Sequence, residues 1–180
     1  FEELKEENVD AMLAGCANLA KHIETIQAFG LPYVVAINEF ATDTPAEVAA
    51  LENWCKEHGH PMALSQVWAK GGAGAETLAQ EVLRLCEEEN HYHPIYDVEE
   101  SIEDKIFKIA STCYGAGSVV YSEEAKEQIA MYQKRGWDKL PICMAKVPTS
   151  LSDQATLYGA PKDFAITVRE FRPSLGAGFI

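Results

Sequence analysis

One segment constrains the fold of this chain more than any other: an apolar run followed by a polar loop and a strong helix start. Residues 33–38 read Tyr-Val-Val-Ala-Ile-Asn and predict a strand that is covered on both faces, as in a parallel sheet. A helix should begin next, because Thr44 can cap it, Pro45 suits its first position and Glu47 can complete a capping box. A strand that feeds a helix through a short loop is typical of α/β proteins.

The same alternation continues along the chain, and a polar, proline-containing break at 90–97 separates two parts. The fold class we predict is α/β: a parallel α/β domain at 1–89, then smaller α+β subdomain(s) at 98–180. Expected helices cover about 2–29 (with Gly30 as its stop), 44–58, 75–88, 99–113 and 122–135, and expected strands cover 33–38, 61–67, 118–121, 141–146 and 164–171.

The composition excludes several classes of protein. A net charge of −13 argues against sequence-independent binding to nucleic acid and against docking on anionic lipid. No apolar run reaches the roughly 20 residues that a membrane helix needs. The five cysteines are odd in number and form no Cys-x-x-Cys pair, which favours reduced thiols in a cytoplasmic protein over disulfides or a zinc site.

Aromatic side chains follow two neighbouring predicted strands at their carboxyl ends. Asn38 and Phe40 follow the first strand, and Trp68 follows the second. Ligands of open α/β sheets bind beyond the carboxyl ends of the strands, so two rings there predict a slot for a flat ligand. The alternatives are that Asn38 only forms a turn and that both aromatics pack in the core.

The segment from Lys70 through Gly71 and Gly72 to Gly74 is rich in glycine and precedes a predicted helix. Backbone N–H groups in such a segment can cradle a phosphate. Its spacing matches neither dinucleotide-binding nor P-loop patterns, so a flexible loop is the plain alternative.

Two pairs of histidines have a spacing that can bind a metal ion on a strand, namely His58 with His60 and His91 with His93. The first pair lies at a predicted helix stop, and the second lies in the polar break with no framework of cysteines or carboxylates close by. We therefore predict turn histidines and no metal site.

Several segments, taken in order, together resemble formate–tetrahydrofolate ligases over nearly the whole chain. They are residues 18–24 (Asn-Leu-Ala-Lys-His-Ile-Glu), 34–38 (Val-Val-Ala-Ile-Asn), 42–44 (Thr-Asp-Thr), 68–72 (Trp-Ala-Lys-Gly-Gly), 139–146 (Lys-Leu-Pro-Ile-Cys-Met-Ala-Lys), 150–153 (Ser-Leu-Ser-Asp) and 176–179 (Gly-Ala-Gly-Phe).

The resemblance implies that residues 1–89 are the end of a P-loop-type parallel α/β domain. It also implies a reaction that uses ATP with Mg²⁺ to join formate and tetrahydrofolate. Formate would attack the terminal phosphate, and N10 of tetrahydrofolate would take the formyl group from formyl phosphate. Phe40 and Trp68 occupy the positions that hold the flat part of the folate, and Leu64 would form an apolar wall. Asn38 and the Lys70–Gly72 segment are candidates for the nucleotide side. The family also implies a homo-oligomer.

The chain departs from the family pattern in the loop after the first strand. Glu39 stands where Lys or Arg is usual, and Ala41 stands where Pro is usual. The family's P-loop has no counterpart in these residues, so we expect it to precede Phe1 in a longer parent protein and expect this chain alone to be inactive. The alternatives are a non-catalytic binding or assembly domain and an unrelated P-loop-type regulatory fragment.

Overall fold

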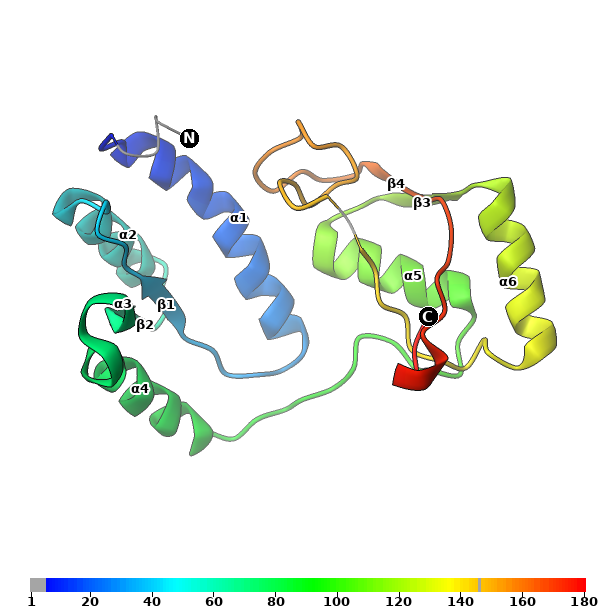
Figure 1. Cartoon of the computed structure of the whole chain (residues 1–180), viewed down its shortest axis with the longest axis horizontal. Helices are drawn as coiled ribbons and strands as arrows, with labels where there is room; N and C mark the ends of the chain where they lie inside the picture. The colour runs from blue at the N-terminus through cyan, green and yellow to red at the C-terminus, as the bar shows by residue number, and fades with distance from the viewer. Residues whose placement is uncertain (1–5, 146) are drawn as a thin grey trace. The chain divides into compact units, whose positions relative to one another are not determined.

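The computed structural model describes residues 6–145 and 147–180, and the chain divides into two compact units (Figure 1). Unit 1 takes the described residues up to Leu19 together with Gly30–Tyr92, and unit 2 takes Ala20–Phe29 and His93–Ile180. Among the described residues, no helix is both long and apolar enough to cross a membrane.

Unit 1 is built on a pair of parallel strands. Strand β1 (Val35–Asn38) pairs with β2 (Met62–Ser65), and the helix α2 (Pro45–Glu57) connects them. The register places Val35 opposite Met62 and Asn38 opposite Ser65, so the two strands end at the same level. The predicted α/β class is confirmed, and each strand is shorter than the apolar run that predicted it.

The predicted capping box of α2 is present. The Thr44 hydroxyl accepts a hydrogen bond from the N–H of Glu47 at 3.3 Å, and the Glu47 carboxylate accepts one from the N–H of Thr44 at 3.2 Å. The same carboxylate also accepts from the N–H of Asn8 at 2.9 Å. These bonds lower the pKa of Glu47 because they favour its charged form, and the bond from Asn8 has the largest effect on that pKa.

Helix α1 (Val9–Ala28) begins later than the sequence suggested. The prediction that this helix begins near residue 2 is wrong for residues 6–8, which are not helical, while residues 1–5 lie outside the described part. Asn8 sets the boundary, because its side chain accepts from the N–H of Ala11 at 2.9 Å and so caps the helix. At the other end, Gly30 takes a left-handed conformation (φ 69°), as a helix stop should.

The glycine-rich segment is not a simple loop. It forms a short helix, α3 (Val67–Lys70), and a 3-10 turn (Gly71–Ala75) that leads into α4 (Glu76–Cys86). A Cβ on Gly74 would lie 2.3 Å from the carbonyl oxygen of Gln66, so only glycine fits there. The close approach also lets the N–H of Gln66 donate to the carbonyl of Gly74 at 2.9 Å.

Unit 2 contains a second parallel pair. Its elements are α5 (Ile102–Ile109), a π turn (Ala110–Tyr114), β3 (Ser118–Tyr121), α6 (Glu123–Arg135), β4 (Ala165–Val168) and a 3-10 turn (Leu175–Ala177). Strands β3 and β4 pair in parallel, with Ser118 opposite Ala165. The apolar faces of α5 and α6 meet the C-terminal segment in one core of Ile102, Ile106, Ala125, Ile129, Tyr132, Phe171 and Ile180.

One predicted strand is wrong. Residues 141–145 form no strand, and position 146 lies outside the described residues. The backbone groups of this segment bond to two separate residues and to no neighbouring strand. Cys143 N–H donates to the carbonyl of Ile180 at 2.8 Å and Ile180 N–H donates to that of Pro141 at 2.9 Å. Ile142 N–H donates to the Tyr96 hydroxyl at 3.0 Å. An apolar run can therefore be extended and hydrogen-bonded without gaining the ladder that defines a strand.

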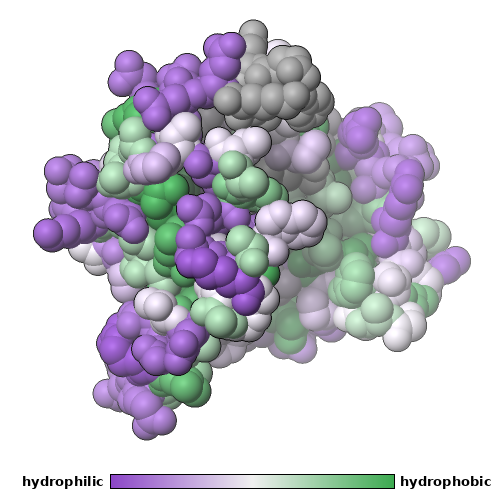
Figure 2. All heavy atoms as spheres, turned by 60° about the vertical axis from the view of Figure 1, so that its left-hand side comes forward, coloured by the Kyte–Doolittle hydropathy of each residue, from purple (hydrophilic) through white to green (hydrophobic). Residues whose placement is uncertain are grey.

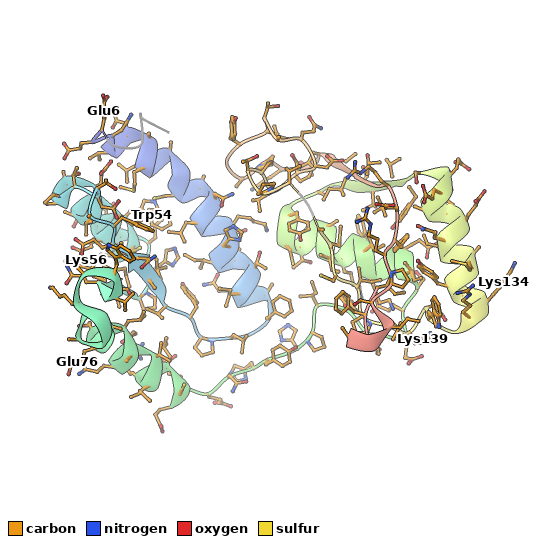
Figure 3. All side chains as sticks on the ribbon, viewed as in Figure 1. Glu6, Trp54, Lys56, Glu76, Lys134 and Lys139 are labelled. Carbon is orange, nitrogen blue, oxygen red and sulfur yellow. The ribbon has the colours of Figure 1, made fainter. Side chains whose placement is uncertain are left out.

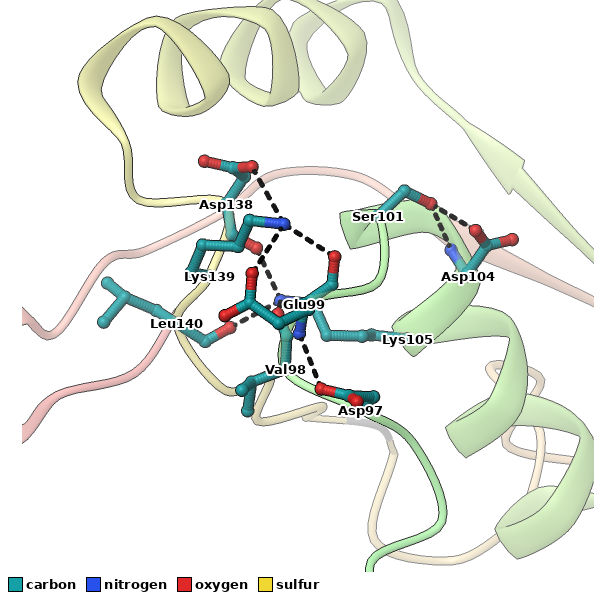
Figure 4. Close-up of polar contacts among 9 residues, drawn as sticks. All are labelled: Asp97, Val98, Glu99, Ser101, Asp104, Lys105, Asp138, Lys139 and Leu140. Atoms are coloured by element: carbon teal, nitrogen blue, oxygen red, sulfur yellow. Dashed lines mark hydrogen bonds and ion pairs between the residues drawn. The ribbon is translucent and has the colours of Figure 1, made fainter.

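Lys105 forms a buried polar centre at α5 (Figure 4). Its ammonium group donates to three backbone carbonyls, those of Val98 at 3.2 Å, Asp138 at 2.6 Å and Leu140 at 2.8 Å. Desolvation lowers the pKa of Lys105, and the nearby charge of Asp138 opposes that shift. The contacts tie the segment before α5 to the loop after α6.

Candidate functional site

The register of β1 and β2 brings the two predicted aromatics to one edge of the sheet. The N–H of Glu39 donates to the carbonyl of Ser65 at 3.0 Å, which extends the strand pairing by one step. Phe40 follows β1 by two residues, and Trp68 follows β2 by three. Both therefore leave the carboxyl edge, where α/β sheets bind ligands.

Neither ring is buried. Phe40 is 58% exposed and Trp68 is 81% exposed, and the neighbouring Val67 is exposed as well. The alternative that the two aromatics pack in the core is therefore not what the structure has. Large apolar side chains that stay exposed forgo the free energy of burial. That the two rings face each other across a slot stays a prediction.

A reciprocal contact closes the loop that carries Phe40. The N–H of Phe40 donates to the Asp43 carboxylate at 2.8 Å, and the carbonyl of Phe40 accepts from the N–H of Asp43 at 3.0 Å. The turn therefore restrains the backbone of Phe40 although position 41 is Ala rather than Pro.

A chain of polar side chains links the two loops. The Gln66 amide nitrogen donates to the Glu39 carboxylate at 2.5 Å, and the Gln66 amide oxygen accepts from the Lys70 ammonium at 2.6 Å. Sequence reasoning did not single out Gln66. The register of β1 and β2 would have predicted this contact, because Glu39 and Gln66 are the next pair after Asn38 and Ser65.

The family model for formate–tetrahydrofolate ligase matches residues 1–180. The chain belongs to the formate–tetrahydrofolate ligase family. This family comprises ligases of one-carbon metabolism that use ATP and tetrahydrofolate. The match excludes an unrelated regulatory protein and confirms the resemblance read from the sequence.

The other candidates from the ligase resemblance lie on the same two segments. Leu64 is partly buried on β2, opposite Ile37, and Asn38 ends β1 with its side chain exposed. Gly71 takes a positive φ of 57°, and Cβ atoms built on Gly71 or Gly72 would meet nothing within 4 Å. The space beside these two glycines is therefore open, whereas the backbone of Gln66 fills the space beside Gly74.

His58 and His60 lie between α2 and β2, and each contacts an aromatic residue. The ring of His58 stacks on Trp54 (labelled in Figure 3) with centroids 4.5 Å apart, and its Nδ1 lies 2.8 Å from the Trp54 carbonyl. The Tyr33 hydroxyl lies 2.8 Å from Nδ1 of His60. Among residues 6–145 and 147–180, no three His, Cys, Asp or Glu side chains gather so as to hold a metal ion.

The surface carries many charged side chains. Figure 2 shows hydrophilic side chains spread over the face in view, with apolar patches between them. Several acidic groups are paired, as in the contacts of Arg84 with Glu81 and Glu88 on α4. Of the residues that the structure describes, no Asp or Glu is buried, so their acidic side chains lie at the solvated surface.

Proposed function

We propose that this chain carries the folate-stacking slot of an ATP-dependent ligase that forms 10-formyltetrahydrofolate. The reaction would join formate to N10 of tetrahydrofolate through formyl phosphate. One observation supports this most: two exposed aromatic side chains, Phe40 and Trp68, leave the same edge of a parallel strand pair in a chain of this family.

In this proposal the chain positions the folate. Stacking between rings contributes about 0.5–1.5 kcal/mol per pair beyond area burial, and Leu64 supplies an apolar wall. Holding the flat ring system fixes the direction of N10, and correct orientation of two reactants removes much of the entropic barrier. The closed turn at Asp43 and the linked loops limit the freedom of both rings.

Phosphoryl transfer needs other parts. The 180 residues contain no Gly-x-x-x-x-Gly-Lys-Ser/Thr segment, and the described residues offer no group of metal ligands. We assign these residues no step that involves Mg²⁺. Asn38, Lys70, Gly71 and Gly72 are proposed for the nucleotide side, where the open glycines allow close approach. We also propose that the intact protein is cytoplasmic and forms a homo-oligomer.

A second candidate function is that of a non-catalytic binding or assembly domain, and it is the absence of a P-loop upstream of Phe1 that would favour it. A ligase and a non-catalytic folate-binding domain both need the slot, whereas an assembly domain does not need to bind tetrahydrofolate.

Calorimetric titration of tetrahydrofolate into the purified chain tests the proposal. We expect Phe40→Ala and Trp68→Ala each to weaken binding up to about tenfold. The control is Tyr158→Ala, since Tyr158 is 72% exposed and belongs to unit 2.

The same variants should lose less than about 1 kcal/mol of unfolding free energy, because their rings are mostly exposed; a buried ring would cost about 3–5 kcal/mol. Unchanged affinity in both slot variants, or a large loss of stability with unchanged affinity, would refute the slot.

A further inference from the structure

Gln66 stands between the two loops that carry the exposed aromatics. It follows β2 directly and precedes Trp68 by two residues, and its partner Glu39 directly precedes Phe40. Gln66 is partly buried, and the carbonyl of Gln66 also accepts from the N–H groups of Ala69 and Lys70 at 3.1 and 2.9 Å. Its side chain and backbone thus contact both segments at once.

The chemistry of the three side chains fixes the direction of the amide. A lysine ammonium only donates and a carboxylate only accepts. The amide oxygen of Gln66 must therefore face Lys70, and its NH₂ must face Glu39, which is the arrangement observed at 2.6 and 2.5 Å. A flipped amide would set donor against donor and acceptor against acceptor. Lys70 and Glu39 together hold Gln66 in one orientation.

We propose that Gln66 is a positioning residue for the folate slot: it links the loop of Phe40 to that of Trp68 and so sets the separation of the two rings. This inference rests on the proposed function. The link acts through the backbone, because Glu39 and Phe40 are adjacent and because Trp68 lies in the helical turn that starts at Gln66. A slot for a flat ligand needs a fixed width, and a charge-assisted bond between the two loops supplies it.

A charge swap tests this role. Gln66→Glu places two acceptors against each other, so the loops should separate and tetrahydrofolate should bind about tenfold or more weakly. Adding Glu39→Gln restores a donor opposite the new carboxylate, which Lys70 still contacts. We expect the double variant to regain wild-type affinity to within about twofold. Gln80→Glu is the matched control, because Gln80 is exposed on α4 and undergoes the same change of charge.

A ligand-free measurement separates failure of this role from failure of the slot. With Trp54→Phe and Trp137→Phe, Trp68 is the only tryptophan of the three, and acrylamide quenching reports its environment. The quenching of Trp68 should change in Gln66→Glu. It should return to its wild-type value when Glu39→Gln is added.

If Trp68→Ala weakens binding while Gln66→Glu binds as the wild type does, the positioning role is wrong and the slot stands. If the wild type binds no tetrahydrofolate, the slot proposal fails. The role of Gln66 in positioning that slot then fails with it, whereas unchanged quenching in Gln66→Glu, with a wild type that binds tetrahydrofolate, overturns the positioning role alone.

Discussion

Replacing the buried Lys105 by methionine should destabilise the chain strongly. Methionine keeps the length and apolar stem of the side chain but removes the ammonium group, so three carbonyls lose their donor. A buried acceptor without a donor costs about 1–3 kcal/mol; the three contacts are part-buried, so we take about 1 kcal/mol for each carbonyl and a sum of about 3 kcal/mol. Relief of the desolvation that lowers the pKa of Lys105 offsets part of that cost. We expect a net loss of about 2–3 kcal/mol.

Thermal and urea melts of Lys105→Met measure this loss. For a chain of this size, 1 kcal/mol corresponds to about 2–4 °C in Tm, so Tm should fall by about 4–12 °C. The control is Lys126→Met, which removes an exposed ion pair with Glu123 on α6 and should change stability by less than about 1 kcal/mol. Equal melts for the two variants would refute the reasoning from the three carbonyls.

The pH dependence gives a second check on Lys105. Because the folded pKa is lowered, the unfolded chain binds more protons between that pKa and the ordinary lysine value. The free energy of unfolding therefore gains a positive slope with pH in that window. Lys105→Met should lack this slope, and an unchanged slope would contradict the assignment.

Three further predictions concern the capping box, the joint and the activity. The pKa of Glu47 is lowered, mainly by the hydrogen bond from the N–H of Asn8. Its carboxylate therefore stabilises the fold at pH values above its unfolded pKa, and this stabilisation is lost as the pH falls through its folded pKa. Glu47→Gln should flatten the acid limb of stability against pH in urea melts, and an unaltered limb would count against it. Limited proteolysis should cut within 90–97 before it cuts β1, because no helix or strand forms at 90–97. Mass spectrometry of the first products measures the order of cleavage. Earlier cleavage of β1 would contradict two domains at 1–89 and 98–180. The purified 180-residue chain should form no 10-formyltetrahydrofolate from ATP, formate and tetrahydrofolate, and turnover above background would contradict the need for a separate phosphate-binding loop.

Local chemistry made much of the fold predictable. The capping box of α2, the left-handed Gly30 after α1, and the bounds of β3 at Ser118–Tyr121 follow from signals within a few residues of each other. Caps and glycine stops act through backbone groups one helical turn away, so the sequence alone contains them. The family was also readable, because its segments occur in order along the chain.

Contacts between distant residues decided the rest. Residues 141–145 form no strand because their backbone groups bond to Ile180 and to the Tyr96 hydroxyl. Glycine is required at position 74 because the backbone of Gln66 lies against it. The exposure of Trp68 is likewise invisible in the sequence, since an aromatic after a strand is buried or exposed according to what packs on it. The bridge from Glu39 to Gln66 needed the register of β1 and β2, which pairs residues 27 positions apart. Sequence signals of the local kind end within one or two turns, and burial and register depend on partners brought together only by the tertiary fold.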